Sequence, residues 1–122
     1  MTTNTKRIAE LNDLCRKAPG IAGKMFLTQG IAALPDADRS AICEKVETFD
    51  SFNADNDPHG EHDFGAFEHG EHKIFWKIDY YDRASFGTGR DMGSEDPSDP
   101  AQTMRVLTIM LARSNGRPIF VA

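Results

Sequence analysis

Residues 72–81 alternate between two kinds of side chain, and this alternation constrains the fold more than any other feature of the chain. Successive side chains of a β-strand point to opposite faces of a sheet, so the alternation predicts a strand with two different faces. Residues 62–67 form a second such segment, and the intervening His69-Gly70 predicts a β-hairpin. The apolar face, which we expect to meet the core, carries Ile74, Trp76, Ile78 and Tyr80.

Two further segments show helical spacing. In residues 5–17 and 36–49, apolar residues recur every three or four positions, which predicts two amphipathic helices. Between them, a short apolar run at residues 25–28 is bounded by glycines and predicts a strand.

The C-terminal part of the chain carries the signature of a helix start. Asp99 can cap a first turn, and Pro100 suits the first helical position. Apolar residues, including Leu107 and Leu111, then recur at helical spacing, which predicts a third helix. Residues 119–121 are apolar and could add an edge strand.

The predicted order of elements is α-β-α-β-β-α, which places the chain in the α+β class. We expect a small antiparallel sheet, made of the β-hairpin plus one or two further strands, with about three helices packed on one face. A chain of 122 residues has the length of one ordinary domain, so we expect residues 1–122 to form a single domain. The other face of the hairpin would be left to a partner or to residues 82–99, the acidic loop.

The composition of the chain indicates in which cellular compartment the protein is located. No segment approaches the roughly 20 apolar residues that a membrane span needs, and the polar N-terminus lacks the apolar region of a signal peptide. Cys15 and Cys43 lie far apart in helical patterns, and we expect both to be reduced and buried. These features favour a cytoplasmic protein that does not enter a membrane.

The net charge of −5 is distributed unevenly. Residues 50–99 hold thirteen Asp and Glu against four Lys and Arg, whereas the remaining residues hold six against ten. An acidic region repels the phosphate backbone, so direct nucleic-acid binding is disfavoured. The same field suits a cation, a basic protein partner or the imitation of a nucleic-acid backbone.

All four histidines fall within residues 59–72, mixed with carboxylates, and raise the alternative of a metal site. They form two H-x-x-H pairs, which could bind zinc or another divalent cation if both pairs curl as turns. On a regular strand, however, residues three apart point to opposite faces, and an all-histidine structural site is unusual. We therefore favour no cofactor and keep the metal site as an alternative. Its ligands would be His59, His62, His69 and His72.

A catalytic site is a second alternative. A histidine titrates near neutrality, and a neighbouring carboxylate can orient it, so a metal-dependent hydrolase or nuclease could form across the hairpin. A nuclease of this type would need an acid at position 75, which is phenylalanine. The simpler interpretation is that these side chains hold the loop that enters the hairpin. The catalytic set would be Glu61, His62, Asp63, Lys77 and Asp79.

The outer face of the hairpin is the best candidate for a binding surface. It interleaves aromatic and charged residues, which is the usual composition of protein interfaces. The acidic loop would add carboxylates beside it. The candidate binding residues are Phe75, Lys77, Asp79, Tyr81, Asp91, Glu95 and Asp96.

Several blocks of the chain resemble one protein family. They are residues 55–65 (DNDPHGEHDFG), 75–82 (FWKIDYYD), 99–101 (DPA) and 105–111 (RVLTIML). Together they are similar to a family of short bacterial proteins, mostly alphaproteobacterial and often carried on plasmids and mobile elements, that is catalogued as a domain of unknown function. The resemblance implies a stand-alone cytoplasmic accessory protein of a mobile element, and it transfers no functional residue.

These observations favour a non-catalytic accessory protein over an enzyme. We expect it to bind a protein partner through the outer hairpin face and the acidic loop. One form of this hypothesis is an inhibitor of a host defence system that presents acid where DNA would lie. The alternatives are the metal-dependent enzyme and a small regulator that forms a homodimer through an exposed strand edge.

Overall fold

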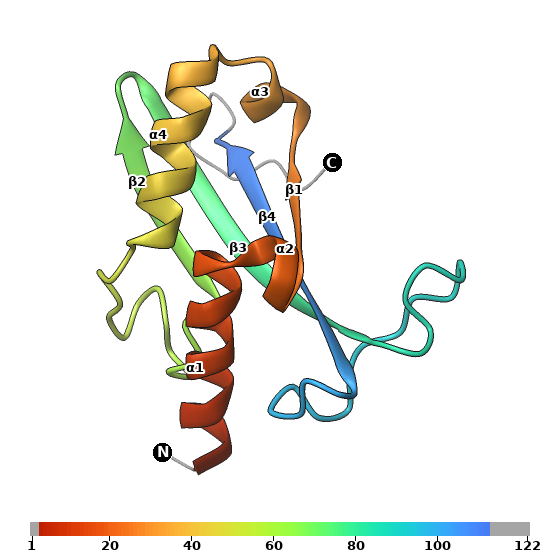
Figure 1. The fold of residues 1–122 in the computed structure, drawn as a ribbon. Coiled ribbons are helices and arrows are strands. Elements are labelled where there is room, and N and C mark those ends of the chain that lie inside the picture. The colour runs from red at the N-terminus through yellow and green to blue at the C-terminus, as the bar shows by residue number, and fades with distance from the viewer. Residues whose placement is uncertain (1–2, 113–122) are drawn as a thin grey trace.

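Two long and two short helices flank a four-stranded sheet in the computed structural model, which describes residues 3–112 (Figure 1). The α+β class predicted from the sequence is confirmed. The elements are α1 (Thr3–Lys17), α2 (Pro19–Ala22), β1 (Lys24–Leu27), α3 (Gln29–Ala32), α4 (Asp36–Glu47), β2 (Phe64–His69), β3 (His72–Asp82) and β4 (Thr103–Leu111).

The sheet has the strand order β1-β4-β3-β2. β2 and β3 form the predicted antiparallel hairpin, with Gly65 opposite Trp76. β3 also pairs antiparallel with β4, with Phe75 opposite Met110, whereas β1 runs parallel to β4 on its other side. The sheet is therefore mostly but not wholly antiparallel, and β1 and β2 form its edges.

The predicted third helix is wrong, because residues Thr103–Leu111 form β4, an inner strand of the sheet. The signal at Asp99 closes a turn instead of starting a helix. Its Oδ1 accepts a hydrogen bond from the Ala101 N–H (2.9 Å), and its Oδ2 accepts one from the Gln102 side-chain amide (2.8 Å). The predicted edge strand at residues 119–121 lies outside the described residues.

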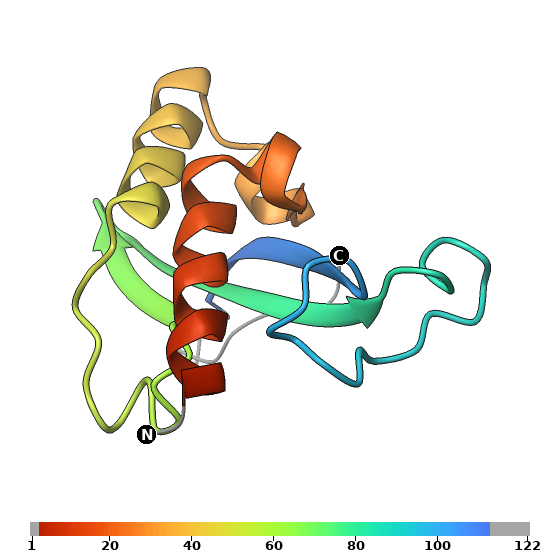
Figure 2. The ribbon, with the colours of Figure 1, turned by 60° about the horizontal axis from the view of Figure 1, so that its bottom comes forward.

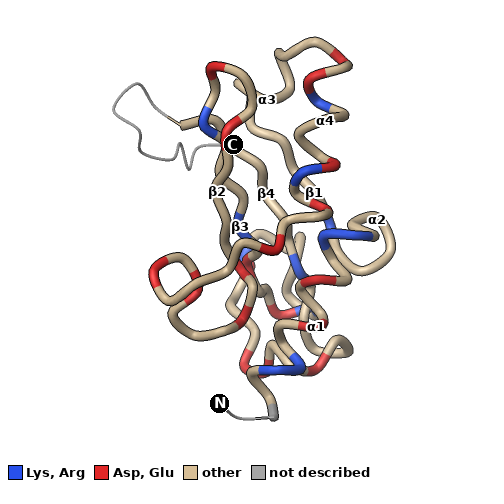
Figure 3. The backbone as a smooth tube through the Cα atoms, turned by 90° about the vertical axis from the view of Figure 1, so that its left-hand side faces the viewer, with Lys and Arg blue, Asp and Glu red and all other residues tan. Residues whose placement is uncertain are grey.

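The two predicted amphipathic helices are confirmed as α1 and α4, which pack on the same face of the sheet (Figure 2). Asp36 and Asp38 lie in the first turn of α4, and Arg16 and Lys17 in the last turn of α1, where each charge favours the helix dipole. Lys/Arg and Asp/Glu positions are interspersed along both helices (Figure 3).

The core lies between these helices and the sheet. The predicted core face of β3 is confirmed, because its alternate residues are buried there and Tyr80 packs against them. The opposite side of the sheet, which α1 and α4 do not cover, is called the outer face below. The buried cluster contains Cys15, Ile31, Ile42, Val46, Ile74, Trp76, Ile78, Leu107 and Ile109.

Close packing at the hairpin requires a glycine. Trp76 is fully buried, and a Cβ atom added to Gly65 on the neighbouring strand would lie 2.4 Å from its Nε1. That separation is far below van der Waals contact, so only glycine fits opposite this indole.

Both cysteines are free thiols. Cys15 is buried and Cys43 is half-buried, and burial raises the pKa of the Cys15 thiol to about 11. No helix within residues 3–112 is long and apolar enough to cross a membrane.

Candidate functional site

The four histidines, which the sequence groups together, lie at different places around the hairpin. His59 and His62 precede β2, whereas His69 and His72 pair across the turn at its other end. His69 Nε2 lies 2.9 Å from Asp38 Oδ1 and so links the hairpin to α4. Within the described part of the chain, no group of three or more His, Cys, Asp or Glu is arranged to hold a metal ion.

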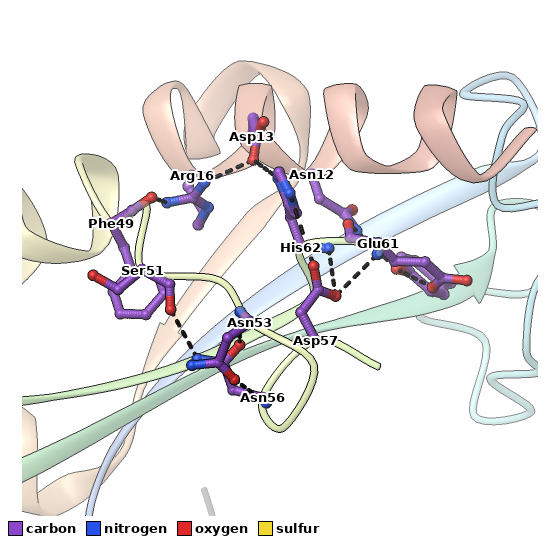
Figure 4. Close-up of polar contacts among 11 residues, drawn as sticks. Asn12, Asp13, Arg16, Phe49, Ser51, Asn53, Asn56, Asp57, Glu61 and His62 are labelled. Atoms are coloured by element: carbon purple, nitrogen blue, oxygen red, sulfur yellow. Dashed lines mark hydrogen bonds and ion pairs between the residues drawn. The ribbon is translucent and has the colours of Figure 1, made fainter. Parts of the chain in front are cut away.

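His62 lies where residues 50–63, the junction loop, meet α1 (Figure 4). Its Nδ1 is 2.9 Å from Asp13 Oδ1, and its Nε2 is 3.8 Å from Asp57 Oδ2. The imidazole stacks on Phe52, with ring centroids 4.0 Å apart and planes 2° apart. His62 also has a φ of 58°, a backbone conformation that few non-glycine residues adopt. These contacts hold one imidazole between two carboxylates.

Asp13 also binds Arg16, whose side chain is only 3% exposed. Arg16 Nη2 donates to Asp13 Oδ1 (2.7 Å), while Nη1 donates to the carbonyl oxygens of Val46 (2.8 Å) and Phe49 (2.9 Å). A buried guanidinium needs such partners, because an uncompensated charge in the interior costs several kcal/mol. Asp13 of α1 therefore contacts both His62 in the junction loop and Arg16, which in turn binds the chain at the end of α4.

A second polar network continues from this junction. Asn12 Nδ2 donates to the backbone oxygen of Glu61 (2.9 Å) and to the Tyr80 hydroxyl (2.7 Å). Tyr80 in turn donates to Glu61 Oε1 (3.0 Å), and Arg105 Nε donates to Asn12 Oδ1 (2.7 Å). Burial is the main cause that raises the pKa of the Tyr80 phenol. The network ties the loop to both α1 and the sheet.

Asp57, which is not among the predicted site residues, holds the chain as it enters the hairpin. Its Oδ1 accepts hydrogen bonds from the backbone N–H groups of Glu61 (3.0 Å) and His62 (3.1 Å). Asp63 instead uses its backbone oxygen, which accepts from the Ile78 N–H (2.9 Å). Burial, and next the Glu61 carboxylate, raise the pKa of the Asp63 side chain.

The five residues of the catalytic alternative do not share a face. Lys77 and Asp79 lie on the outer face and pair with each other, with Nζ and Oδ2 3.0 Å apart. His62 lies on the helix side, against Asp13. The Asp13–His62 pair borders two clefts, of about 550 and about 480 Å³. An imidazole held by a carboxylate at a cleft has the geometry of a general base.

On the outer face, side chains from three strands and the acidic loop surround a groove of about 310 Å³, called the outer-face groove below. It brings together four of the residues predicted to bind a partner: Lys77, Asp79, Tyr81 and Asp91. Its other lining residues are Phe26, Phe86, Val106 and Thr108.

Strand register explains why these side chains meet. Phe26 of β1 pairs with Thr108 of β4, which pairs with Lys77 of β3, so the three form one row across the sheet. Phe26 lies on the edge strand and is 48% exposed. Tyr81 lies further along β3, and its ring centroid is 5.5 Å from that of Phe86 in the acidic loop.

The acidic loop is fastened to the end of β3. The Asp82 N–H donates to the Met92 carbonyl (2.7 Å), and the Ser94 N–H donates to the Tyr80 carbonyl (3.1 Å). Within the loop, the Asp91 carboxylate accepts from the Gly87 N–H (2.6 Å). These bonds place Asp91 at the rim of the groove.

Three of the predicted binding residues lie outside the groove. Phe75 is only 7% exposed, because its ring packs 5.8 Å from that of Phe64 and lies beneath the Lys73 ammonium. Phe75 is therefore part of the packed interior and not an accessible contact. Glu95 is exposed but does not line the groove, and Asp96 accepts hydrogen bonds from within its own loop.

The sequence did not single out Phe26 or Phe86, although both line the groove. Phe26 lies in the predicted strand at residues 25–28, but nothing in that run indicates that it pairs with residues 106–109. Phe86 lies in a glycine-rich segment with no periodicity. A phenylalanine in an otherwise polar loop was the one available signal for it.

Comparison with known proteins gives one match. Residues 27–114 match the model of a family described as "Protein of unknown function (DUF3768)". No curated protein and no solved structure matches the chain.

Proposed function

Because the chain belongs to the DUF3768 family, whose description names no activity, we propose a function from geometry alone: a non-catalytic accessory protein that binds a protein partner through the outer-face groove. The observation that carries this proposal is the gathering of Lys77, Asp79, Tyr81 and Asp91 around one groove on the face of the sheet that the helices leave uncovered.

The composition of the groove supports a protein ligand. Three aromatic residues, Phe26, Tyr81 and Phe86, are surrounded by charged side chains. Aromatic anchors within a charged rim supply most of the binding energy at protein interfaces, because the rim excludes water from the buried contact. Phe26 is the strongest candidate anchor, because half of its surface is open to solvent.

The charge of the acidic loop supports a basic partner. Residues 82–99 hold five Asp and Glu against two Lys and Arg. Such a surface would attract a basic protein and repel nucleic acid. In its more specific form, the proposal is a cytoplasmic, mobile-element inhibitor that occupies the nucleic-acid site of a defence protein.

Capture experiments with purified variants test this proposal. The Phe26→Ser and Asp91→Lys variants should each lower the yield of the partner retained from lysate of the native host, measured by quantitative mass spectrometry. Glu44→Lys, which makes the same charge change on exposed α4, is the matched control and should retain it. Equal retention by all three variants would remove the groove from the interface.

A metal-dependent enzyme is a second candidate: the Asp13–His62 pair borders two clefts, although within residues 3–112 no group of three or more His, Cys, Asp or Glu is arranged to hold the metal. This candidate requires stoichiometric metal in tag-free protein, measured by elemental mass spectrometry, and its loss in His62→Gln. If the protein is metal-free, the role left for His62 is structural: it fixes the junction loop against α1 through Asp13.

A homodimeric regulator is a third candidate, favoured by the exposed side chains of the edge strand β1. Its test is sedimentation velocity over a range of protein concentrations. A sedimentation coefficient that rises with concentration would support the dimer, and a constant value for the monomer would exclude it.

A further inference from the structure

A second groove, of about 330 Å³, lies between α1, α2 and the chain that leads into β4. Its apolar wall includes Leu14, which is 52% exposed, and Ile21, which is 93% exposed. Its charged residues are Arg7, Arg83 and Arg105, and no carboxylate from residues 3–112 lines it. We call it the arginine groove. A groove of this character is unexpected in a chain whose net charge is −5.

Arg105 is the least ordinary of its residues, because it is a buried cation (3% exposed). Nε donates to the Asn12 amide and Nη2 to the Pro97 carbonyl, and the guanidinium carbon lies 5.2 Å from the centre of the Tyr80 ring, while Nη1 donates to no group within residues 3–112. Within the same residues, no carboxylate forms an ion pair with it. The Tyr80 ring and the more distant Glu61 carboxylate compensate this buried charge in part, and a carboxylate in direct contact would compensate it further, so the guanidinium points to an anionic ligand.

Two hydrogen bonds to backbone carbonyls fix the Arg83 side chain at the same groove. Its Nε donates to the Pro100 carbonyl (3.1 Å), and its Nη2 donates to the Thr103 carbonyl (3.1 Å). A guanidinium fixed in this way loses little conformational entropy when it binds a carboxylate. Arg7 adds a third positive charge, and its exposed contact with Glu10 is long, at 3.9 Å.

From these observations we propose that the arginine groove binds an acidic peptide segment of a partner protein. Carboxylates would pair with Arg83 and Arg105, and a neighbouring apolar side chain would cover Leu14 and Ile21. Arginine prefers carboxylates because its planar fork can donate two parallel hydrogen bonds to one of them. The apolar wall favours a peptide over a free anion, because a free anion would leave this surface exposed.

This surface is separate from the outer-face groove. Arg105 points to the helix side of β4, and Val106, the next residue, lines the groove on the opposite side. Among residues 3–112, the two grooves also share no lining residue. A partner could therefore contact one without the other.

Titration of the intact chain with defined peptides, followed by amide chemical shifts in NMR spectra, tests the proposal. The probe is acetyl-Glu-Leu-Glu-Leu-amide, and the comparison peptide is acetyl-Lys-Leu-Lys-Leu-amide. We expect saturable shifts at Leu14, Ile21, Arg83 and Thr103 with the acidic peptide alone. Arg83→Gln and Ile21→Ser, both at exposed positions, should each weaken its binding about tenfold.

The matched control is Arg90→Gln, which removes the same charge from an exposed residue outside the groove and should leave the affinity unchanged. No saturable shift with the acidic peptide would overturn the proposal. Equal weakening by Arg90→Gln would also overturn it, since it would show general charge attraction. Binding to phosphatidylglycerol vesicles without any response to the peptide would likewise overturn it and assign the groove to a lipid surface.

Discussion

At the scale of single residues, the contact between Gly65 and Trp76 gives the clearest stability test. We expect Gly65→Ala to lower the free energy of unfolding by about 2–3 kcal/mol, because the new methyl group would overlap the buried indole. Denaturant unfolding of the parent and the variant measures this difference in free energy. Gly20→Ala is the control, since its Cβ would meet nothing within 4 Å, and it should stay within about 0.5 kcal/mol of the parent. Equal stability of the two variants would contradict this packing.

The Asp63 carboxyl gives a pH-dependent test. Burial and the Glu61 charge raise its pKa in the folded state, so ionised Asp63 destabilises the fold above that pKa, and the penalty disappears below the unfolded value of 3.8. We expect Asp63→Asn to raise the Tm by about 2 °C at neutral pH, with the gain vanishing in acid. Asp55→Asn, at an exposed position of the same loop, should leave the Tm unchanged. A gain in Tm that does not depend on pH would show that it does not arise from the ionisation of Asp63.

The His62 site shows which contacts of single residues can be predicted from the sequence and which cannot. The sequence drew attention to His62, yet its closest partner, Asp13, lies 49 positions earlier on α1. Apolar spacing describes α1 as a helix, but it does not report which loop its polar residues will meet. Arg16 is a similar case: it looks like a surface residue at a helix end and is instead buried.

At the scale of elements, β4 shows why one assignment failed. A strand buried on both faces carries apolar residues without alternation, and periodicity alone cannot separate it from a buried helix. The β-branched residues Thr103, Val106, Thr108 and Ile109 were the contrary signal, because they favour strands. By contrast, the hairpin was predictable, since β3 has a covered face and an outer face that differ in composition.

Backbone chemical shifts test the identity of β4. We expect Cα and Cβ shifts of residues 103–111 to deviate from random-coil values in the direction typical of strands. Residues 36–47 of α4 provide an internal reference with the opposite sign. Helical deviations at residues 103–111 would contradict the strand and with it the floor of the outer-face groove.

At the scale of the whole molecule, the two faces of the sheet have different roles. α1, α4 and the junction loop cover one face and enclose the core. The outer face receives Phe26 from an edge strand and Phe86 from the acidic loop. The sequence predicted that Lys77, Asp79 and Tyr81 share this face, because alternation decides it. It could not predict the two phenylalanines, because their positions depend on pairing between β1 and β4 and on the path of a loop.

Site-specific photo-crosslinking tests the binding role of the outer-face groove most directly. A photoreactive benzoylphenylalanine in place of Phe26 would lie at the groove, whereas the same residue in place of exposed Ser40 on α4 would lie on the other side of the sheet. We expect one protein from the native host to be crosslinked from position 26 and not from position 40, with a lower yield after Asp91→Lys. The same adducts from both positions, or none from position 26, would contradict a partner-binding groove.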